Sequence, residues 1–281
     1  MRISAYVLVA DPAFVQESLL AYYDHVDRIV LSYDETATSW TGTPLPVQEC
    51  LSLIEAIDRD RKCVHAPGRF ARLDEHPLEN ETYQRQTALD AASEDADWVL
   101  QLDTDEVMLD APRFFAALDR ADATGTSGMD YPARWLYARV GDSDRFLEAS
   151  SRLWRVRAGY PGAVAVRAGT QLAHARQTDV PLYRVDFRPW NTDPAHRKDA
   201  AVHATIPINS AIAHYSWVRD DETMRRKFGW SGHAADYSKP EVYRRWASRQ
   251  RHPLRTVMTT PFRNDDWFRL ARVRQMRGAR G

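Results

Sequence analysis

Short apolar runs alternate with segments of helical periodicity along the first hundred residues. The runs at 3–10 and 98–102 are almost continuously apolar, which is typical of central strands covered on both faces. The predicted strands span 3–10, 28–33, 62–66 and 98–102, and the predicted helices span 14–23, 47–57 and 80–93. Asp11 and Pro12 are predicted as the N-cap and first position of the first helix. This alternation predicts a parallel sheet with right-handed crossovers.

Beyond residue 112 the pattern changes to short strands separated by loops. After a short helix near 112–118, strands are predicted at 131–140, 151–156, 163–166, 183–187 and 211–217, and another helix begins at Asp220. The fold class predicted is α/β, with a mixed, mainly parallel central sheet flanked by helices and a C-terminal helical appendage. We expect one domain at 1–238, made of halves 1–110 and 111–238, followed by a basic helical extension at 239–281.

Composition narrows the class of protein. The sequence is 44% hydrophobic and 27% charged, which is ordinary for a globular protein. A chain of 281 residues is long enough to bury a full core. No apolar run approaches the roughly 18 residues of a membrane span, and the apolar N-terminal segment lacks the length and cleavage pattern of a signal peptide. Cys50 and Cys63 are too few for a disulfide framework and lack zinc spacing. We therefore expect a cytoplasmic protein.

The net charge of −1 hides an asymmetry. Residues 239–281 carry twelve Lys and Arg against three Asp and Glu, a net charge of +9, which leaves −10 for the rest. Such a segment could contact anionic lipid, a phosphorylated ligand, nucleic acid or the acidic body of its own chain. The acidic body and the lack of a DNA- or RNA-binding motif argue against nucleic acid. Peripheral membrane contact stays open, although no helix in this segment is apolar enough to establish it.

Three carboxylates follow the apolar run at 98–102, in the segment Asp103-Thr104-Asp105-Glu106. The carboxyl end of a strand is where open α/β sheets bind ligands. Two aspartates one residue apart can bind one hard divalent cation, which could then neutralise a phosphate. The alternative is that Asp103 caps the next turn and the others are solvated. No Gly-x-Gly-x-x-Gly follows the first strand and no P-loop occurs, which disfavours the dinucleotide and P-loop versions of such a fold.

Two segments carry a family resemblance. Residues 97–106, Asp-Trp-Val-Leu-Gln-Leu-Asp-Thr-Asp-Glu, preceded by the helix with Asn-Glu-Thr-Tyr-Gln-Arg-Gln at 80–86, resemble the GT-A glycosyltransferases of the family 2 type, particularly bacterial members. His-Tyr-Ser-Trp-Val-Arg at 214–219, followed by Met224 and Lys227, is similar to a segment near the end of those domains. The resemblance implies a GT-A fold, a nucleotide-sugar donor, most often a UDP- or GDP-sugar, a Mn²⁺ or Mg²⁺ ion, and an unidentified acceptor. The half at 1–110 would bind the nucleotide, and 111–238 would supply the acceptor site and a lid.

The resemblance also suggests roles for individual residues. Asp34 would lie near the nucleobase or ribose, and Arg85 would face the base or phosphate. Asp103 would lie near the ribose or, through water, the metal, while Asp105 and His214 would bind the metal directly. The remaining residues expected to contact the donor are Ala10, Asp11, Arg219 and Lys227, the last two adding positive charge above the diphosphate. The simpler alternatives are a cap for Asp34, a surface position for Arg85 and a buried, hydrogen-bonded histidine for His214.

The catalytic base is the least defined part of the prediction. An inverting enzyme needs a group that deprotonates the acceptor hydroxyl, and Asp186 and Asp193 fall at a suitable distance along the chain, with Glu148 as a third option. A retaining enzyme would need none of them. Two rival functions stay open: a nucleotidyltransferase, which would usually carry a Gly-rich, basic loop after the first strand, and a non-catalytic binding protein on a decayed transferase fold.

Overall fold

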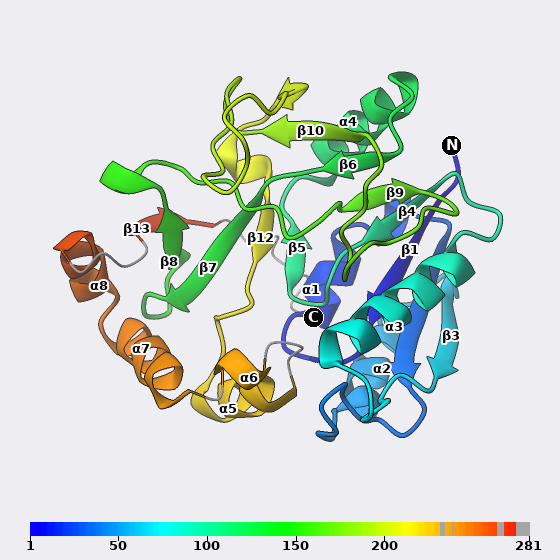
Figure 1. Cartoon of the computed structure of the whole chain (residues 1–281), viewed down its shortest axis with the longest axis horizontal. Coiled ribbons are helices and arrows are strands. Elements are labelled where there is room, and N and C mark those ends of the chain that lie inside the picture. The colour runs from blue at the N-terminus through cyan, green and yellow to red at the C-terminus, as the bar shows by residue number, and fades with distance from the viewer. Residues whose placement is uncertain (231–233, 238, 263–266, 274–281) are drawn as a thin grey trace.

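The computed structural model describes residues 1–230, 234–237, 239–262 and 267–273. Its elements form two sheets with helices on the outside, and the segment around Asp103 connects a strand of one sheet to a strand of the other (Figure 1). Within the described residues, no helix is both long and apolar enough to cross a membrane.

The larger sheet has eight strands and is mainly parallel. Its order is β11 (Ala204–Thr205), β10 (Leu182–Asp186), β6 (Gly128–Asp130), β9 (Ala165–Arg167), β4 (Trp98–Gln101), β1 (Ile3–Leu8), β2 (Arg28–Asp34) and β3 (Cys63–Gly68). Only β9 runs antiparallel to its neighbours, β4 and β6. The predicted fold class, a mixed and mainly parallel sheet flanked by helices, is therefore confirmed.

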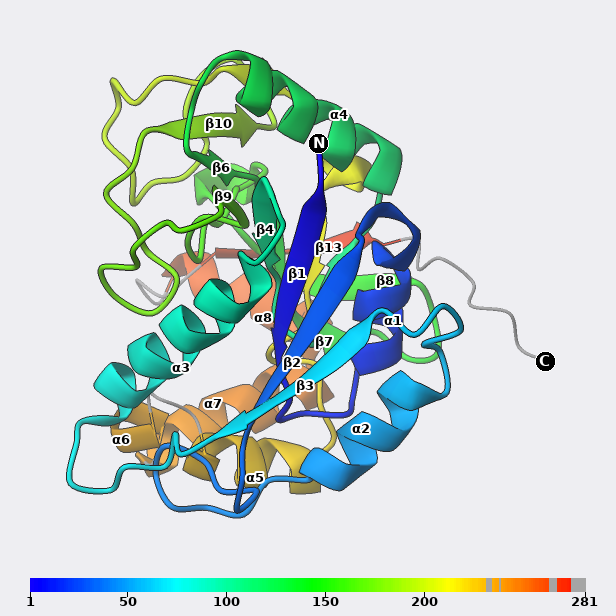
Figure 2. The same cartoon turned by 90° about the vertical axis from the view of Figure 1, so that its right-hand side faces the viewer.

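Strand β1 shows why helices cover both faces of this sheet. All six of its residues are buried, and successive side chains of a strand point to opposite faces. Ala5 and Val7 pack in the core that includes residues of α1 (Val15–Leu20) and α2 (Val47–Glu55). Tyr6 and Leu8 pack in a second core with residues of α3 (Pro77–Ala92). Figure 2 shows α3 on one side of β1, β2 and β3 and α1 and α2 on the other.

The second sheet has five strands and forms the other wall of the molecule. Its order is β13 (Trp267–Arg272), β8 (Arg145–Ser150), β7 (Ala133–Arg139), β12 (Ile212–His214) and β5 (Glu106–Met108). The chain leaves β4 of the large sheet, passes through Asp103 to Asp105, and enters β5 of this one. The predicted acidic segment therefore lies at the junction of the two sheets.

Several helices complete the structure. They are α4 (Ala111–Ala123), α5 (Asp221–Trp230), α6 (Ala234–Tyr237), α7 (Pro240–Arg251) and α8 (Pro253–Thr259), with 3₁₀ turns η1 (Tyr23–His25), η2 (Arg152–Trp154), η3 (Ile208–Ser210) and η4 (Thr260–Phe262). Trp246 of α7 packs with Met224 and Phe228 of α5. The predicted extension is therefore packed against the element that precedes it.

Three predictions about elements need correction. The extension is not wholly helical, because β13 pairs antiparallel with β8 along six residues. The strand expected at 151–156 lies at Arg145–Ser150 instead, and η2 takes its place. Helix α1 begins at Val15 with Phe14 at the N-cap position, so Asp11 is not the cap. One Asp11 oxygen accepts from the Ala13 amide at 3.1 Å, and the other binds an arginine of the C-terminal half.

Candidate functional site

A cavity of about 430 Å³ opens at the carboxyl ends of β1, β2 and β4 and is closed from the other side by residues around β7, β12 and α5. It lies where the strand ends of an α/β sheet ordinarily bind ligands. Most of the predicted site residues line it: Ala10, Asp11, Asp34, Arg85, Asp103, Asp105, His214 and Lys227. The remaining donor-contact residue, Arg219, lies directly behind two of these carboxylates.

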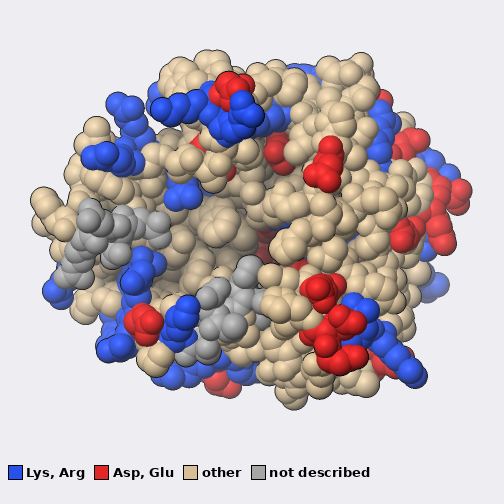
Figure 3. Space-filling model, in the orientation of Figure 1, with Lys and Arg blue, Asp and Glu red and all other residues tan. Residues whose placement is uncertain are grey.

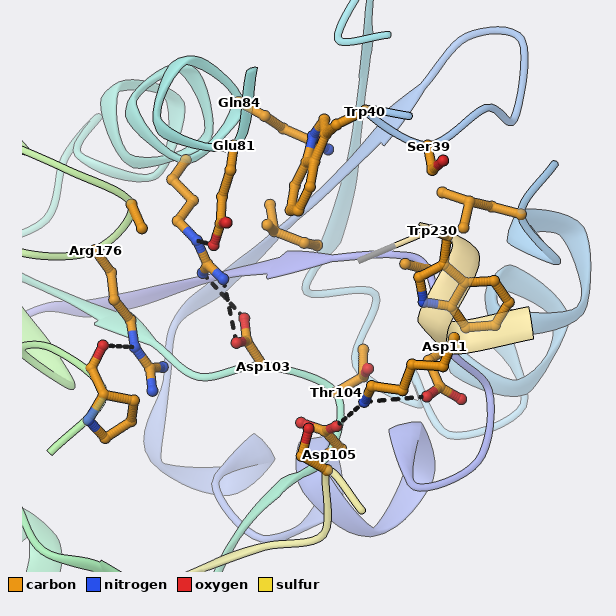
Figure 4. A pocket seen from close by; sticks show the side chains of 18 of the residues that line it. Asp11, Ser39, Trp40, Glu81, Gln84, Asp103, Thr104, Asp105, Arg176 and Trp230 are labelled. Atoms are coloured by element: carbon orange, nitrogen blue, oxygen red, sulfur yellow. Dashed lines mark hydrogen bonds and ion pairs between the residues drawn. The ribbon is translucent and has the colours of Figure 1, made fainter. Parts of the chain in front are cut away.

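A tight turn presents the two aspartates. The Glu106 amide donates to the Asp103 carbonyl at 3.0 Å, and the Asp103 amide donates to a Glu106 carboxylate oxygen at 3.0 Å. Ser18 of α1 donates its hydroxyl hydrogen to the carbonyl of Asp103 or of Glu106, at 3.1 and 2.8 Å. The turn is thus fixed from both ends, and the Asp103 and Asp105 side chains leave it in different directions (Figure 4).

Asp103 is held by Arg85 of α3. The guanidinium donates to both carboxylate oxygens at 3.0 and 3.1 Å and also to Glu81 at 3.0 Å (Figure 4). Burial would raise the pKa of Asp103, but the charges of Arg85 and Arg176 outweigh it and lower that pKa. The structure thus brings Arg85 and Asp103 together in the cavity, with Arg85 on its wall rather than on the outer surface of α3.

Asp105 is held by three cationic or imidazole groups. Lys227 Nζ donates to it at 2.6 Å and Arg219 Nη2 at 3.0 Å, and His214 Nε2 lies 3.5 Å away. The register of β12 against β5, which pairs His214 with Glu106, places the imidazole beside the turn. Burial would raise the pKa of Asp105, but Lys227, His214 and Arg219 hold it well below its usual value.

Asp11 completes this cluster from the end of β1. Its carboxylate accepts from Arg219 Nε at 3.0 Å and Nη2 at 2.8 Å, and Lys227 Nζ lies 3.7 Å away. Arg219 is almost fully buried and also donates to the Tyr215 carbonyl at 2.6 Å. Two carboxylates from the N-terminal half and two cations from the C-terminal half therefore form one buried, charge-balanced group.

Cationic side chains occupy the carboxylates that were predicted to bind a divalent ion. Both oxygens of Asp103 accept from Arg85, while Asp105 is occupied by Lys227 and Arg219. Within the described ranges, no three His, Cys, Asp or Glu side chains form a group that could hold a metal. An ion between Asp105 and His214 would require Lys227 to withdraw. The ion predicted at Asp103, Asp105 and His214 stays a prediction.

Asp34 has the contacts of a structural carboxylate. It accepts from the backbone amides of Phe70 at 2.8 Å, Ala71 at 2.9 Å and Thr36 at 3.0 Å. Burial would raise its pKa, but these hydrogen bonds, with that of the Thr36 hydroxyl, lower it. The capping alternative accounts for these contacts, and a contact with ribose or base stays a prediction.

The three candidate bases do not line the cavity. Asp186 is fully buried and accepts from the Phe187 and Thr192 amides, and Asp193 binds the Ala195 amide and His196. Glu148 is fully buried between Arg134 and Arg269. All three carboxylates are therefore bound to partners away from the cavity lining, and a role for any of them as a base stays a prediction.

The sequence analysis missed two residues of the loop between β9 and β10. His174 is exposed and lines the cavity. Arg176 is buried and donates to both Glu106 oxygens at 2.6 and 2.5 Å and to the Gln101 carbonyl at 2.6 Å. The loop has no periodic pattern that would single out either residue. The Arg176 ion pair anchors the loop to the acidic turn and so holds His174 at the cavity.

An aromatic wall faces the acidic turn. Trp40 and Trp230 both line the cavity, and Figure 4 shows them on the side remote from Arg176. Trp40 is oriented by a hydrogen bond from its ring nitrogen to Gln84 at 2.7 Å, and Gln84 in turn donates to Ser32 at 3.2 Å. Charged and aromatic side chains therefore line the cavity together, with Trp230 beside Asp11 (Figure 4).

No protein-family model and no curated protein matches the chain. Among solved structures, a 4-diphosphocytidyl-2C-methyl-D-erythritol synthase from Anaerococcus prevotii is 12% identical with a TM-score of 0.36, covering 59% of this chain and 71% of its own. A CMP:2-keto-3-deoxy-manno-octonic acid synthetase in complex with CTP is 10% identical with a TM-score of 0.33, covering 60% of this chain and 75% of its own. Such scores leave the assignment of the fold to the sheet topology itself: this chain has a mixed, mainly parallel α/β sheet flanked by helices.

Proposed function

We propose that this protein is a glycosyltransferase that moves a sugar from a nucleotide-sugar donor, a UDP- or GDP-sugar, to a hydroxyl acceptor. The observation that carries the proposal is the Asp103 to Glu106 turn, which lies between two sheets at the strand ends and faces an aromatic wall across one cavity. Aromatic side chains suit a nucleobase, and the cationic side chains of the same cavity suit a diphosphate.

The leaving diphosphate would be stabilised by Lys227 on the cavity wall, with the charge of Arg219 behind it. Negative charge develops on the diphosphate as the glycosidic bond breaks, and preorganised cations in a water-poor site stabilise such charge strongly. Both side chains already lie at the end of β1, fixed by Asp11 and Asp105. The carboxylates would hold the cations in place before the donor arrives. A Mn²⁺ or Mg²⁺ ion, if bound, would supply the same neutralisation, so its requirement is tested separately.

His174 is the base that the cavity offers for the acceptor. A base must accept a proton, and a carboxylate bound to a cation is a weak base. Asp103 and Glu81 are bound to Arg85, and Asp11 and Asp105 to Arg219. The His174 imidazole is exposed at the cavity, and imidazole is the side chain most often used as a general base. In an inverting reaction it would take the acceptor hydroxyl proton.

Nucleotidyl transfer is the second candidate. The names of the two solved structures fit it better than they fit glycosyl transfer, and one of those proteins holds CTP. The likeness to them is too weak to decide between the two reactions. The segment after β1, residues 9–14, has neither the glycines nor the basic residue that a triphosphate loop ordinarily uses, and this favours a diphosphate donor.

Product analysis separates the two reactions. The purified protein would be incubated with UDP-, GDP- and dTDP-sugars, and separately with the four nucleoside triphosphates and sugar phosphates, each with Mn²⁺ or with EDTA. Release of a nucleoside diphosphate from a nucleotide sugar, with water or an added sugar as acceptor, supports glycosyl transfer. Release of pyrophosphate from a triphosphate supports the second candidate. Binding of nucleotides without turnover in any mixture favours a non-catalytic binding protein.

A further inference from the structure

A stripe of exposed apolar side chains runs along the C-terminal helix. Leu254, Met258 and Phe262 are 62%, 70% and 87% exposed, and their spacing of four residues puts them on one side of α8 and the 3₁₀ turn that follows. A helix of a globular protein ordinarily turns such residues toward the core. Here the opposite side, with Thr256 and Thr260, is the buried one.

A second exposed apolar pair lies beside this stripe. Leu153 and Trp154 in η2 are 63% and 45% exposed, and the Trp154 ring nitrogen donates to the Val257 carbonyl of α8 at 3.4 Å. Both residues have positive φ, 58° and 55°. Bulky residues seldom adopt this conformation, because it costs free energy, and it persists mainly where function holds it. The strained turn presents both side chains to solvent.

Arginines surround the apolar patch, which we define as Leu153, Trp154, Leu254, Met258 and Phe262. Segments 152–157 and 251–262 contain five arginines and no Asp or Glu; the arginines are Arg152, Arg155, Arg157, Arg251 and Arg255. Four of them are exposed. In Figure 3, Lys and Arg side chains gather on the left of the molecule, the side on which Figure 1 places α7 and α8.

We propose that the apolar patch and its arginines dock the protein on an anionic membrane surface. Aromatic and aliphatic side chains on a convex element insert at the level of the lipid headgroups, while arginines around them bind the anionic headgroups. Arginine stems also lie along apolar surface with the charge outward. An exposed apolar stripe with arginines beside it fits a negatively charged, deformable surface, and this proposal does not depend on the reaction at the cavity.

The position of the patch determines from which side a membrane would approach the cavity. Helix α8 packs against β13, which is the edge strand of the sheet whose strand β7 carries the cavity residue Trp135. The patch therefore lies on the side of the second sheet, away from β2 and β3 (Figure 1). A membrane-bound acceptor would approach the cavity from the half that the sequence predicts to bind acceptors.

Vesicle binding tests the proposal with the full chain. Sedimentation with vesicles of phosphatidylcholine, alone or mixed with phosphatidylglycerol, is expected to show binding to the mixed vesicles that weakens at high salt. The Met258→Ser/Phe262→Ser double variant should bind at least about tenfold more weakly, since each buried methylene contributes substantially to insertion. Arg251→Gln/Arg255→Gln should also weaken binding and should reduce its salt dependence.

Matched variants show whether the loss of any exposed apolar or basic side chain would weaken vesicle binding. Leu73→Ser removes a side chain that is 68% exposed on the loop before α3, and Arg197→Gln removes an exposed arginine elsewhere; both should bind like the wild type. All these positions are exposed, so thermal midpoints should be unchanged. The proposal is overturned if the wild type ignores mixed vesicles, or if the serine variants bind equally well. It is also overturned if light scattering shows a dimer that Phe262→Ser dissociates, since a second copy would then cover the patch.

Discussion

Asp105 is the residue through which the two halves of the site meet. It accepts from Lys227 and Arg219, which the chain supplies more than a hundred residues later, and lies 3.5 Å from His214. The sequence singled out Asp105 because it follows a short apolar run, and His214 because the segment 214–219 carries a family resemblance. It could not show that Arg219 binds Asp11 as well, since that contact depends on how the second sheet packs against the first.

Replacing Asp105 by Asn should abolish most of the donor-dependent activity. The amide cannot hold Lys227 and Arg219 by charge, and removing one preorganised electrostatic contact from a site costs on the order of 10²-fold in turnover. Nucleoside diphosphate release from the donor that the wild type accepts is the readout. Asp199→Asn, at an exposed ion pair, is the matched control. Near-normal release in Asp105→Asn, with the fold intact, would contradict the mechanism.

His174→Gln should lower turnover by about 10²- to 10⁴-fold, the usual contribution of a general base, without weakening donor binding. The pH dependence of kcat/KM should lose the limb that reports the base, and added imidazole should restore part of the activity of His174→Ala. A histidine with a merely structural role would not give this rescue. His65→Gln, at an exposed histidine outside the cavity, should behave like the wild type.

At the scale of elements, Asp34 joins the end of β2 to the chain after β3. Its pKa is lowered in the folded protein, so its stabilising contribution is complete above the unfolded value of about 3.9 and is lost as the pH falls through the folded value. Urea unfolding should show Asp34→Asn to be less stable than the wild type at neutral pH. The difference should shrink below about pH 4. A difference that stays constant over this range would show that the ionised carboxylate is not the stabilising form.

Strand β13 makes the C-terminal segment part of the fold. Phe268 is fully buried and lies edge-on to Tyr137 with ring centroids 4.9 Å apart. Phe268→Ala should therefore lower the free energy of unfolding by about 3–5 kcal/mol, as large-to-small changes in a core do. Arg272→Ala, at an exposed position of the same strand, should change it by less than about 0.5 kcal/mol. Equal small effects in both would mean that β13 is dispensable.

Local signals predicted the elements of the first hundred residues well and those of the second half less well. Strands β1, β2 and β4 were recognisable because both faces are buried and their runs are nearly continuous. Strand β8 was not, because Arg145 and Glu148 interrupt it, and Glu148 is buried only through Arg134 and Arg269. The charge of Glu148 is compensated by arginines on two neighbouring strands, β7 and β13, whereas the local sequence pattern predicts an exposed residue.

At the scale of the whole molecule, the acidic body and the basic C-terminal segment proved to be parts of one structure. Arg269 and Arg272 of β13 pair with Glu148 and Asp144 of the body, at 3.2 and 3.7 Å. The arginines around α8 and η2 are not part of these two pairs. The net charge of the segment could not distinguish arginines that pair with the body from arginines that are exposed, because it does not show which side chains are buried.

The most direct measurement is thermal unfolding of the purified protein against UDP, GDP, dTDP, CMP and CTP, each with Mn²⁺ or with EDTA. A ligand present at about 100 times its dissociation constant adds roughly 2.7 kcal/mol to the free energy of unfolding, which shifts the midpoint visibly. The account predicts a shift with one nucleoside diphosphate, lost in Asp105→Asn, and the EDTA arm shows whether a divalent ion is required. A shift with CTP alone would favour nucleotidyl transfer, and no shift with any nucleotide would contradict a nucleotide-sugar site in this cavity.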